Sequence, residues 1–202
     1  MALRLITAPA AEPLTLTEAK AHLRVDHTDD DILISALIAA SRGYCEQWTA
    51  RAFITQTWEL MIDEFPEDGD IMIPMPPLQS VTSVKYDDGD GVEQTLSATD
   101  YDVDNVSQPG WVVSATSGWP TSTFDGINSV RVRFVAGYEP GTDSPIDLAA
   151  NVPQSIRAAI LLHVGQLYEN REDIIVGAVV NKMPTGGIEH LLRQYRVALG
   201  MA

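Results

Sequence analysis

The spacing of the apolar residues changes twice along this chain of 202 residues. Between Ile34 and Trp48 the apolar residues recur at every third or fourth position, which predicts a helix of about 20 residues. Over residues 53–63 they alternate with polar residues, which is typical of a half-buried strand. From Ile156 to Leu167 the helical spacing returns. The sequence therefore predicts an α+β fold, in which a helical bundle carries a central antiparallel β insertion.

Local signals mark the ends of the predicted helices. Thr15 and Glu18 fit a capping box, in which each side chain accepts a backbone hydrogen bond at the start of a helix that runs to about Val25. The acidic run at residues 29–31 favours the start of the long helix, and Pro153 suits the first turn of another. A final short helix is expected from the apolar residues Ile188, Leu191, Leu192 and Tyr195.

Short apolar stretches between the helical regions predict strands joined by turns. Residues 87–91 have the sequence DDGDG, which is typical of a hairpin turn. Strands are expected at residues 53–63, 71–73, 81–86, 92–96, 101–103, 111–114 and 130–134. The chain then divides into a helical connector core, residues 1–52 and 138–202 (two N-terminal and two C-terminal helices), and a β-rich insertion, residues 53–137.

The net charge of −15 is concentrated in one part of the chain. Residues 59–104 hold thirteen acidic residues and one base, Lys85, whereas residues 153–202 carry a net charge of +1. This excess of acid argues against a protein that grips duplex DNA, because such binding needs Lys and Arg at the phosphates. We expect a soluble protein of intracellular origin, since the sequence begins without a secretion signal and has no run of roughly 18 apolar residues.

No residue pattern indicates catalysis, a cofactor or a metal ion. The run at residues 87–91 lacks the ligand spacing of an EF-hand loop, and none of the four histidines forms an HExxH or HxH pattern. Ser41 is not part of a GxSxG motif, and Cys45 lacks an electropositive setting. His163 lies on an apolar helix face, where a hydrogen-bonded core histidine is expected. The absence of such a pattern argues against an enzyme only weakly, because a site can also assemble from residues that are distant in the sequence.

Two segments have the composition of contact surfaces. Residues 174–180 are apolar between polar flanks, which fits either a buried connector or a segment that orders against a neighbouring chain. The basic C-terminal helix carries Arg193, Tyr195 and Arg196, residue types that are enriched at interfaces. An ordinary amphipathic terminal helix has the same pattern, so both interpretations stay open.

The order of several short motifs resembles a known protein family. Each motif alone is weak, but their order and spacing along most of the chain are more specific. They are PLTLTEAKAHLRV at residues 13–25, DDDIL at 29–33, QTWEL at 56–60, VPQSIR at 152–157, YENRE at 168–172 and LLRQYR at 191–196. In this order they resemble the head–tail connector (adaptor or head-completion) proteins of long-tailed phages and gene transfer agents. The long β insertion departs from the shorter, all-helical members of that family.

The resemblance implies a structural virion protein. Family members form a ring, usually of twelve copies, beneath the portal of the DNA-filled head, where the ring extends the DNA channel and joins the head to the tail. The implied partners are the portal protein, a stopper or other tail-proximal connector, and further copies of the same chain. Double-stranded DNA would pass through without specific binding, and no membrane or cofactor is implied. The implied location is the head–tail junction of a virion or gene-transfer-agent particle, after synthesis in the bacterial cytoplasm.

The resemblance also implies where the portal binds. The C-terminal part of family members commonly docks on the portal, which corresponds to residues 174–196 of this chain. The implied portal-binding residues are Ile174, Ile175, Val176, Val179, Val180, Lys182, Leu191, Leu192, Arg193, Tyr195 and Arg196.

Two other functions remain alternatives. One is a monomeric module whose β insertion binds a ligand, for example a polysaccharide through Trp111 and Trp119, or a protein. The other is a metal-dependent enzyme that uses the acidic cluster. If the chain does form a ring, we expect acidic surface to face the channel or the solvent, since acidic residues repel DNA phosphates and a basic lumen would bind them.

Overall fold

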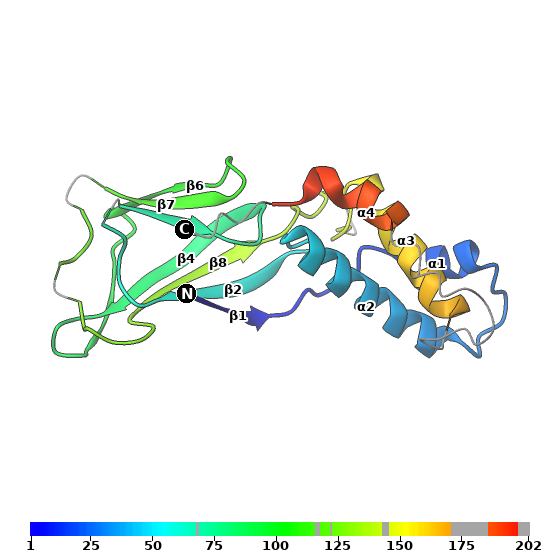
Figure 1. The fold of residues 1–202 in the computed structure, drawn as a ribbon, viewed down its shortest axis with the longest axis horizontal. Helices are drawn as coiled ribbons and strands as arrows, with labels where there is room; N and C mark the ends of the chain where they lie inside the picture. The colour runs from blue at the N-terminus through cyan, green and yellow to red at the C-terminus, as the bar shows by residue number, and fades with distance from the viewer. Residues whose placement is uncertain (68, 116–117, 122, 143–145, 171–185, 198–202) are drawn as a thin grey trace.

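The computed structural model describes residues 1–67, 69–115, 118–121, 123–142, 146–170 and 186–197. The strands gather at one end of an elongated molecule and the helices at the other (Figure 1). The predicted α+β fold is therefore confirmed, with its helical and β-rich regions side by side along the long axis.

The larger sheet has five antiparallel strands. Their order across the sheet is β1-β2-β8-β4-β5, so that β1 and β5 form its two edges. The strands are β1 (Ala2–Thr7), β2 (Gln56–Ile62), β8 (Val130–Ala136), β4 (Leu78–Asp87) and β5 (Glu93–Thr95). The predicted strands in this region are confirmed, and Asp88 organises the expected turn by accepting the Asp90 and Val92 N–H groups.

A second sheet covers one face of the first. It has three antiparallel strands in the order β3-β7-β6: β3 (Asp70–Ile73), β7 (Gly110–Ser114) and β6 (Tyr101–Asp104). Alternating side chains from both sheets form one apolar core. This core consists of Ala52, Leu60, Ile71, Ile73, Leu78, Val84, Tyr101, Val112, Trp119, Val132, Phe134 and Ala136.

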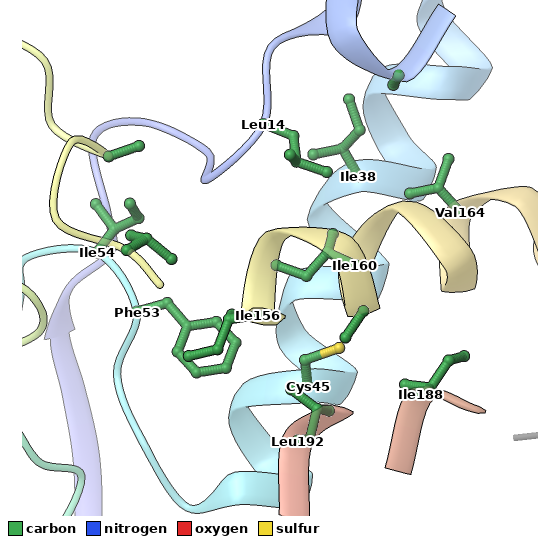
Figure 2. Packing of buried hydrophobic residues seen from close by; sticks show 14 of the residues in the cluster. Leu14, Ile38, Cys45, Phe53, Ile54, Ile156, Ile160, Val164, Ile188 and Leu192 are labelled. Carbon is green, nitrogen blue, oxygen red and sulfur yellow. The ribbon is translucent and has the colours of Figure 1, made fainter. Parts of the chain in front are cut away.

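The helices form a separate core. The four α-helices are α1 (Leu16–Leu23), α2 (Asp31–Thr49), α3 (Gln154–Glu169) and α4 (Gly186–Leu192), and a 3-10 turn, η1 (Arg193–Tyr195), follows α4. The capping box of Thr15 and Glu18 is present at the start of α1. Pro153 is the residue that precedes α3 and not its first helical residue. Figure 2 shows Cys45 of α2, Ile160 of α3 and Leu192 of α4 within this core.

The strand β1 is the main feature that the sequence does not predict. Residues 2–7 pair with β2, so they belong to the β-rich end although they precede the helices in the chain. This differs from the expected division, which assigned residues 1–52 to the helical part. The pattern was missed because all six side chains of β1 are exposed, so that burial imposes no alternation between apolar and polar residues.

A buried carboxylate joins the two ends of the molecule. Glu46 of α2 accepts hydrogen bonds from the Phe53 N–H (2.7 Å), from Gln56 Nε2 of β2 (2.8 Å) and from Arg42 Nη1 (2.6 Å). Burial raises the pKa of Glu46, although these donors act in the opposite direction. Arg42 also binds Glu12, so one network holds the start of β2 against the helices.

Backbone contacts complete this junction. The Ala52 N–H donates to the Pro76 carbonyl oxygen (3.2 Å), and the Gly137 N–H donates to the Pro77 carbonyl oxygen (2.9 Å). Gly137 has a φ of +125° where the chain leaves β8, a conformation that residues with a Cβ atom rarely adopt. The junction therefore depends on the close approach of the Gly137 backbone to the backbone of Ile54 and Thr55.

Candidate docking surface at the C-terminal helix

The helix α4 is held by two side chains that the helical core encloses. Ile188 and Leu192 are completely buried, and in Figure 2 both point toward α2 and α3. Leu192 was among the predicted portal-binding residues; its side chain is buried in the helical core, and its contact with a portal stays a prediction. Leu191 is half-buried against the same core.

The outer side of this segment is basic. His190, Arg193 and Arg196 are exposed, and the guanidinium of Arg196 lies 5.1 Å from the centre of the Trp48 ring. Tyr195, which is half-buried, packs against the helical core. We call His190, Arg193, Arg196 and Trp48 the C-terminal surface. Its two arginines, against Glu189 of α4, make it a local excess of positive charge on a chain whose net charge is −15.

The end of this segment is anchored to α2 and to the β-rich end. The Val197 N–H donates to the Thr49 carbonyl oxygen (3.0 Å). Arg51 is buried, and its guanidinium donates to the Tyr195 carbonyl oxygen and to Gln108 Oε1, the latter at 2.7 Å. Arg51 therefore connects the C-terminal surface with the loop between β6 and β7, and it fixes the position of both.

Replacing Arg51 tests this anchor. We expect Arg51→Met to lower the free energy of unfolding by about 2–3 kcal/mol, because the substitution leaves the Tyr195 carbonyl and the Gln108 side chain without their donor. Urea unfolding measures this loss, and hydrogen exchange should accelerate at the Val197 amide. The matched control is Arg24→Met at an exposed arginine, where a change within about 0.5 kcal/mol is expected. Equal stability of the two variants would contradict the anchoring role.

The remaining predicted portal-binding residues are not placed by the structure. Ile174, Ile175, Val176, Val179, Val180 and Lys182 lie outside the described residues. The structure therefore brings together Arg193, Tyr195 and Arg196 and adds Trp48, His190 and Arg51, which the sequence did not single out. Only a tertiary contact links Trp48 to Arg196, and no local sequence signal reveals it.

Two residues that were considered for catalysis, Cys45 and His163, are packed against other side chains of the helical region. Cys45 is buried, and its burial raises the pKa of the thiol to about 12. His163 stacks on Tyr44 with ring centres 4.5 Å apart, and burial lowers its pKa. Its Nδ1 atom has no hydrogen-bond partner among the described residues, so the hydrogen bond expected for a core histidine is not found at this atom.

The acidic and aromatic residues of the β-rich end that were considered for ligand binding also make contacts within the chain. Asp87 is paired with Arg131 at 2.5 Å. Trp119 is buried, stacks on Phe65 at 4.7 Å and donates to the Gly69 carbonyl oxygen (2.8 Å), so its ring is not available to a polysaccharide. Among the described residues, no group of three or more His, Cys, Asp or Glu side chains is arranged to hold a metal ion. In the same part of the chain, no helix is long and apolar enough to cross a bilayer.

Comparison with family models supports the resemblance that the order of the motifs indicates. Residues 13–108 match the family model of the phage gp6-like head-tail connector proteins. This match covers α1, α2 and the strands β2 to β6. No curated protein matches the chain significantly.

Solved structures match over nearly the full length. A chain in the neck of an empty gene transfer agent particle, computed with C6 symmetry, has a TM-score of 0.78 and 23% identity. A chain in the virion of a native gene transfer agent particle has a TM-score of 0.75 and 23% identity, and one in the neck of a native particle, computed with C12 symmetry, has 0.74 and 22%. Each match covers 99% of this chain and 98% of the other. The resemblance is thus confirmed: residues 13–108 match the head-tail connector family, and the whole chain has the fold of proteins in gene transfer agent particles.

Proposed function

We propose that this chain is a structural connector protein at the head–tail junction of a phage or gene transfer agent particle. The observation that carries the proposal is the full-length match to chains of particle necks, from α1 through the β-rich end to α4. The family model supports the same role over residues 13–108. In this proposal the protein has a structural role and no enzymatic one.

The finer proposal is a ring of copies through which DNA passes. Two of the matching neck structures were computed with C6 and C12 symmetry, which fits copies arranged around an axis. The charges of the β-rich end support passage without gripping. Its four cations, Arg4, Lys85, Arg131 and Arg133, each pair with a carboxylate at 2.5–2.7 Å, and Arg4 and Arg133 share Glu59. Cations that are already neutralised in this way contribute little to binding DNA phosphates.

The C-terminal surface is the proposed portal contact. Arg193 and Arg196 are exposed, and Arg196 lies beside the Trp48 ring; arginine and tryptophan are both common at binding hot spots. A partner with an acidic, partly apolar groove would complement it. Residues 174–182 remain part of the same proposal on the grounds of sequence alone.

Charge reversal tests the portal contact. We expect the double variant Arg193→Glu, Arg196→Glu to bind portal rings at least 10-fold more weakly than the unmodified chain, because it turns attraction into repulsion. Light scattering of the purified chain with and without portal rings measures the binding. The control is Arg24→Glu, which reverses the charge of an exposed arginine just after α1, far from the C-terminal surface in the sequence. This control should bind portal rings normally. Unchanged binding of the double variant would refute the portal contact.

A monomeric carbohydrate-binding module is less well supported. Trp119, one of its two expected aromatic residues, is part of the core between the sheets. A chain that stays monomeric and does not bind portal rings would nevertheless favour a module of this kind, and the same light-scattering experiment detects it.

A further inference from the structure

The edge strand β1 exposes apolar side chains along its whole length. Leu3 is 38% exposed, Leu5 is 43% exposed and Ile6 is 38% exposed. On one side β1 pairs with β2, and on the other side it ends the five-stranded sheet. A long apolar edge strand promotes unwanted pairing with other chains, and proteins normally block or cover such an edge.

The apolar groups of β1 continue the inner face of the sheet. Leu3 lies directly opposite Leu60 and Leu5 opposite Trp58, so they share the face that packs on the second sheet. Beside them is a hollow of about 250 Å³ between β2 and β3. Its lining is Met1, Leu60, Ile62, Glu64, Pro66, Asp70, Ile71 and Met72. The open side of the two-sheet sandwich is therefore apolar at β1.

The opposite edge of the same sheet has a different character. Val92, the residue before β5, is 55% exposed. Glu93 of β5 is half-exposed and acidic, and it pairs with Lys85 at 2.7 Å and with Arg131 at 3.1 Å. The hairpin that carries β5 belongs to residues 59–104, which hold thirteen acids and one base. The β1 edge, in contrast, carries Arg4 and no acidic residue. Arg4 pairs with Glu59 of β2 at 2.5 Å, but Glu59 also pairs with Arg133, so two cations share one carboxylate and a net positive charge remains. One edge thus combines apolar groups with a cation, and the other combines an apolar group with carboxylates.

Opposite, complementary edges suit a cyclic assembly. Subunits around an axis contact one another head to tail, so each must carry two different surfaces that fit together. We propose that the β1 edge of one copy packs against the β5 edge of a neighbouring copy, with Leu3 and Leu5 against Val92 and with Arg4 near Glu93. This inference rests on the proposed ring at the head–tail junction and specifies which surfaces hold its subunits together.

Photo-crosslinking in assembled particles tests the contact. Leu5→p-benzoylphenylalanine is incorporated into the full chain, and particles are purified from cells that carry the encoding genome. We expect a covalent dimer of the chain after illumination, with the crosslinked peptide containing residues 92–95. The control Leu162→p-benzoylphenylalanine places the probe on an exposed position of α3 and should not give this peptide.

The outcomes separate this inference from the proposed function. If the chain is in the particles and the probe at Leu5 links only to another protein, or to nothing, the β1–β5 contact is refuted and the connector role stands. If the chain is missing from the particles, the proposed function itself fails. A second variant, Leu5→Lys, guards against a probe that disturbs assembly: it should enter particles at least 10-fold less often than Leu162→Lys, while both variants unfold at the same temperature as the unmodified chain. Normal entry of Leu5→Lys would also refute the contact.

Discussion

Replacing Gly137 by Ala is expected to unfold the junction between the two ends of the molecule. A Cβ atom at this position would overlap the Ile54 carbonyl oxygen and lie 2.5 Å from its carbon and 2.7 Å from the Thr55 nitrogen. These are backbone atoms, so no side-chain rotation relieves the overlap, and the φ of +125° is itself unfavourable for Ala. We expect a loss of more than about 4 kcal/mol in the free energy of unfolding, measured by urea denaturation followed by circular dichroism.

The control for Gly137 is a glycine in open space. Gly43 lies on the exposed side of α2, and a Cβ atom there would meet nothing within 4 Å. Gly43→Ala should therefore stabilise the protein by about 0.5–1 kcal/mol, since Ala favours the helix. If Gly137→Ala were as stable as Gly43→Ala, the close approach of Gly137 to the Ile54 backbone would be refuted.

Removing the buried carboxylate of Glu46 is expected to have the second largest effect. Glu46→Ala leaves the Phe53 N–H and the Gln56 amide without their acceptor in the interior, and it takes one of the two carboxylates from Arg42. Uncompensated buried groups of this kind cost several kcal/mol, and we expect a loss of about 3–4 kcal/mol in the free energy of unfolding. Chemical denaturation measures the difference.

Glu12 provides the matched comparison, because it binds the same arginine. Its side chain is 31% exposed and accepts from Arg42 Nε at 2.7 Å. Glu12→Ala should cost no more than about 1 kcal/mol, as is usual for a partly exposed ion pair. Similar losses for both variants would mean that Arg42 alone accounts for the stability, and the role assigned to the Phe53 and Gln56 hydrogen bonds would be refuted.

Local signals in the sequence were sufficient for most of the elements. The capping box at Thr15, the apolar stripe of α2 and the DDGDG turn each act through neighbours a few positions away, and all three are found where they were expected. The strand β1 was missed because its partners lie 50 to 59 positions away in β2 and its side chains are exposed. Nothing in residues 2–7 alone reports that pairing.

The candidate site was predictable only in outline. The basic character of Arg193 and Arg196 is visible in the sequence, and the structure leaves both exposed. The burial of Leu192, the approach of Trp48 to Arg196 and the anchoring by Arg51 depend on how distant segments meet. Arg51 and Tyr195, for example, are 144 positions apart. Periodicity identifies which helix faces are apolar, but it does not say which neighbour covers each side chain.

The structure also shows which charged groups are paired and which are exposed. The net charge of −15 excluded a DNA-gripping role from the outset. The structure adds that the cations of the β-rich end are held in ion pairs, whereas exposed basic groups occur on the C-terminal surface. This difference between the two ends is consistent with the proposed connector, which would contact unlike components.

Cryo-electron microscopy of the neck of particles produced by the encoding genome tests the central claim most directly. A map of the head–tail junction should contain a ring of copies of this chain, with the C-terminal surface toward the portal and a lumen that is not dominated by Arg and Lys. A neck that is fully occupied by other proteins, with no density for this fold, would contradict the account.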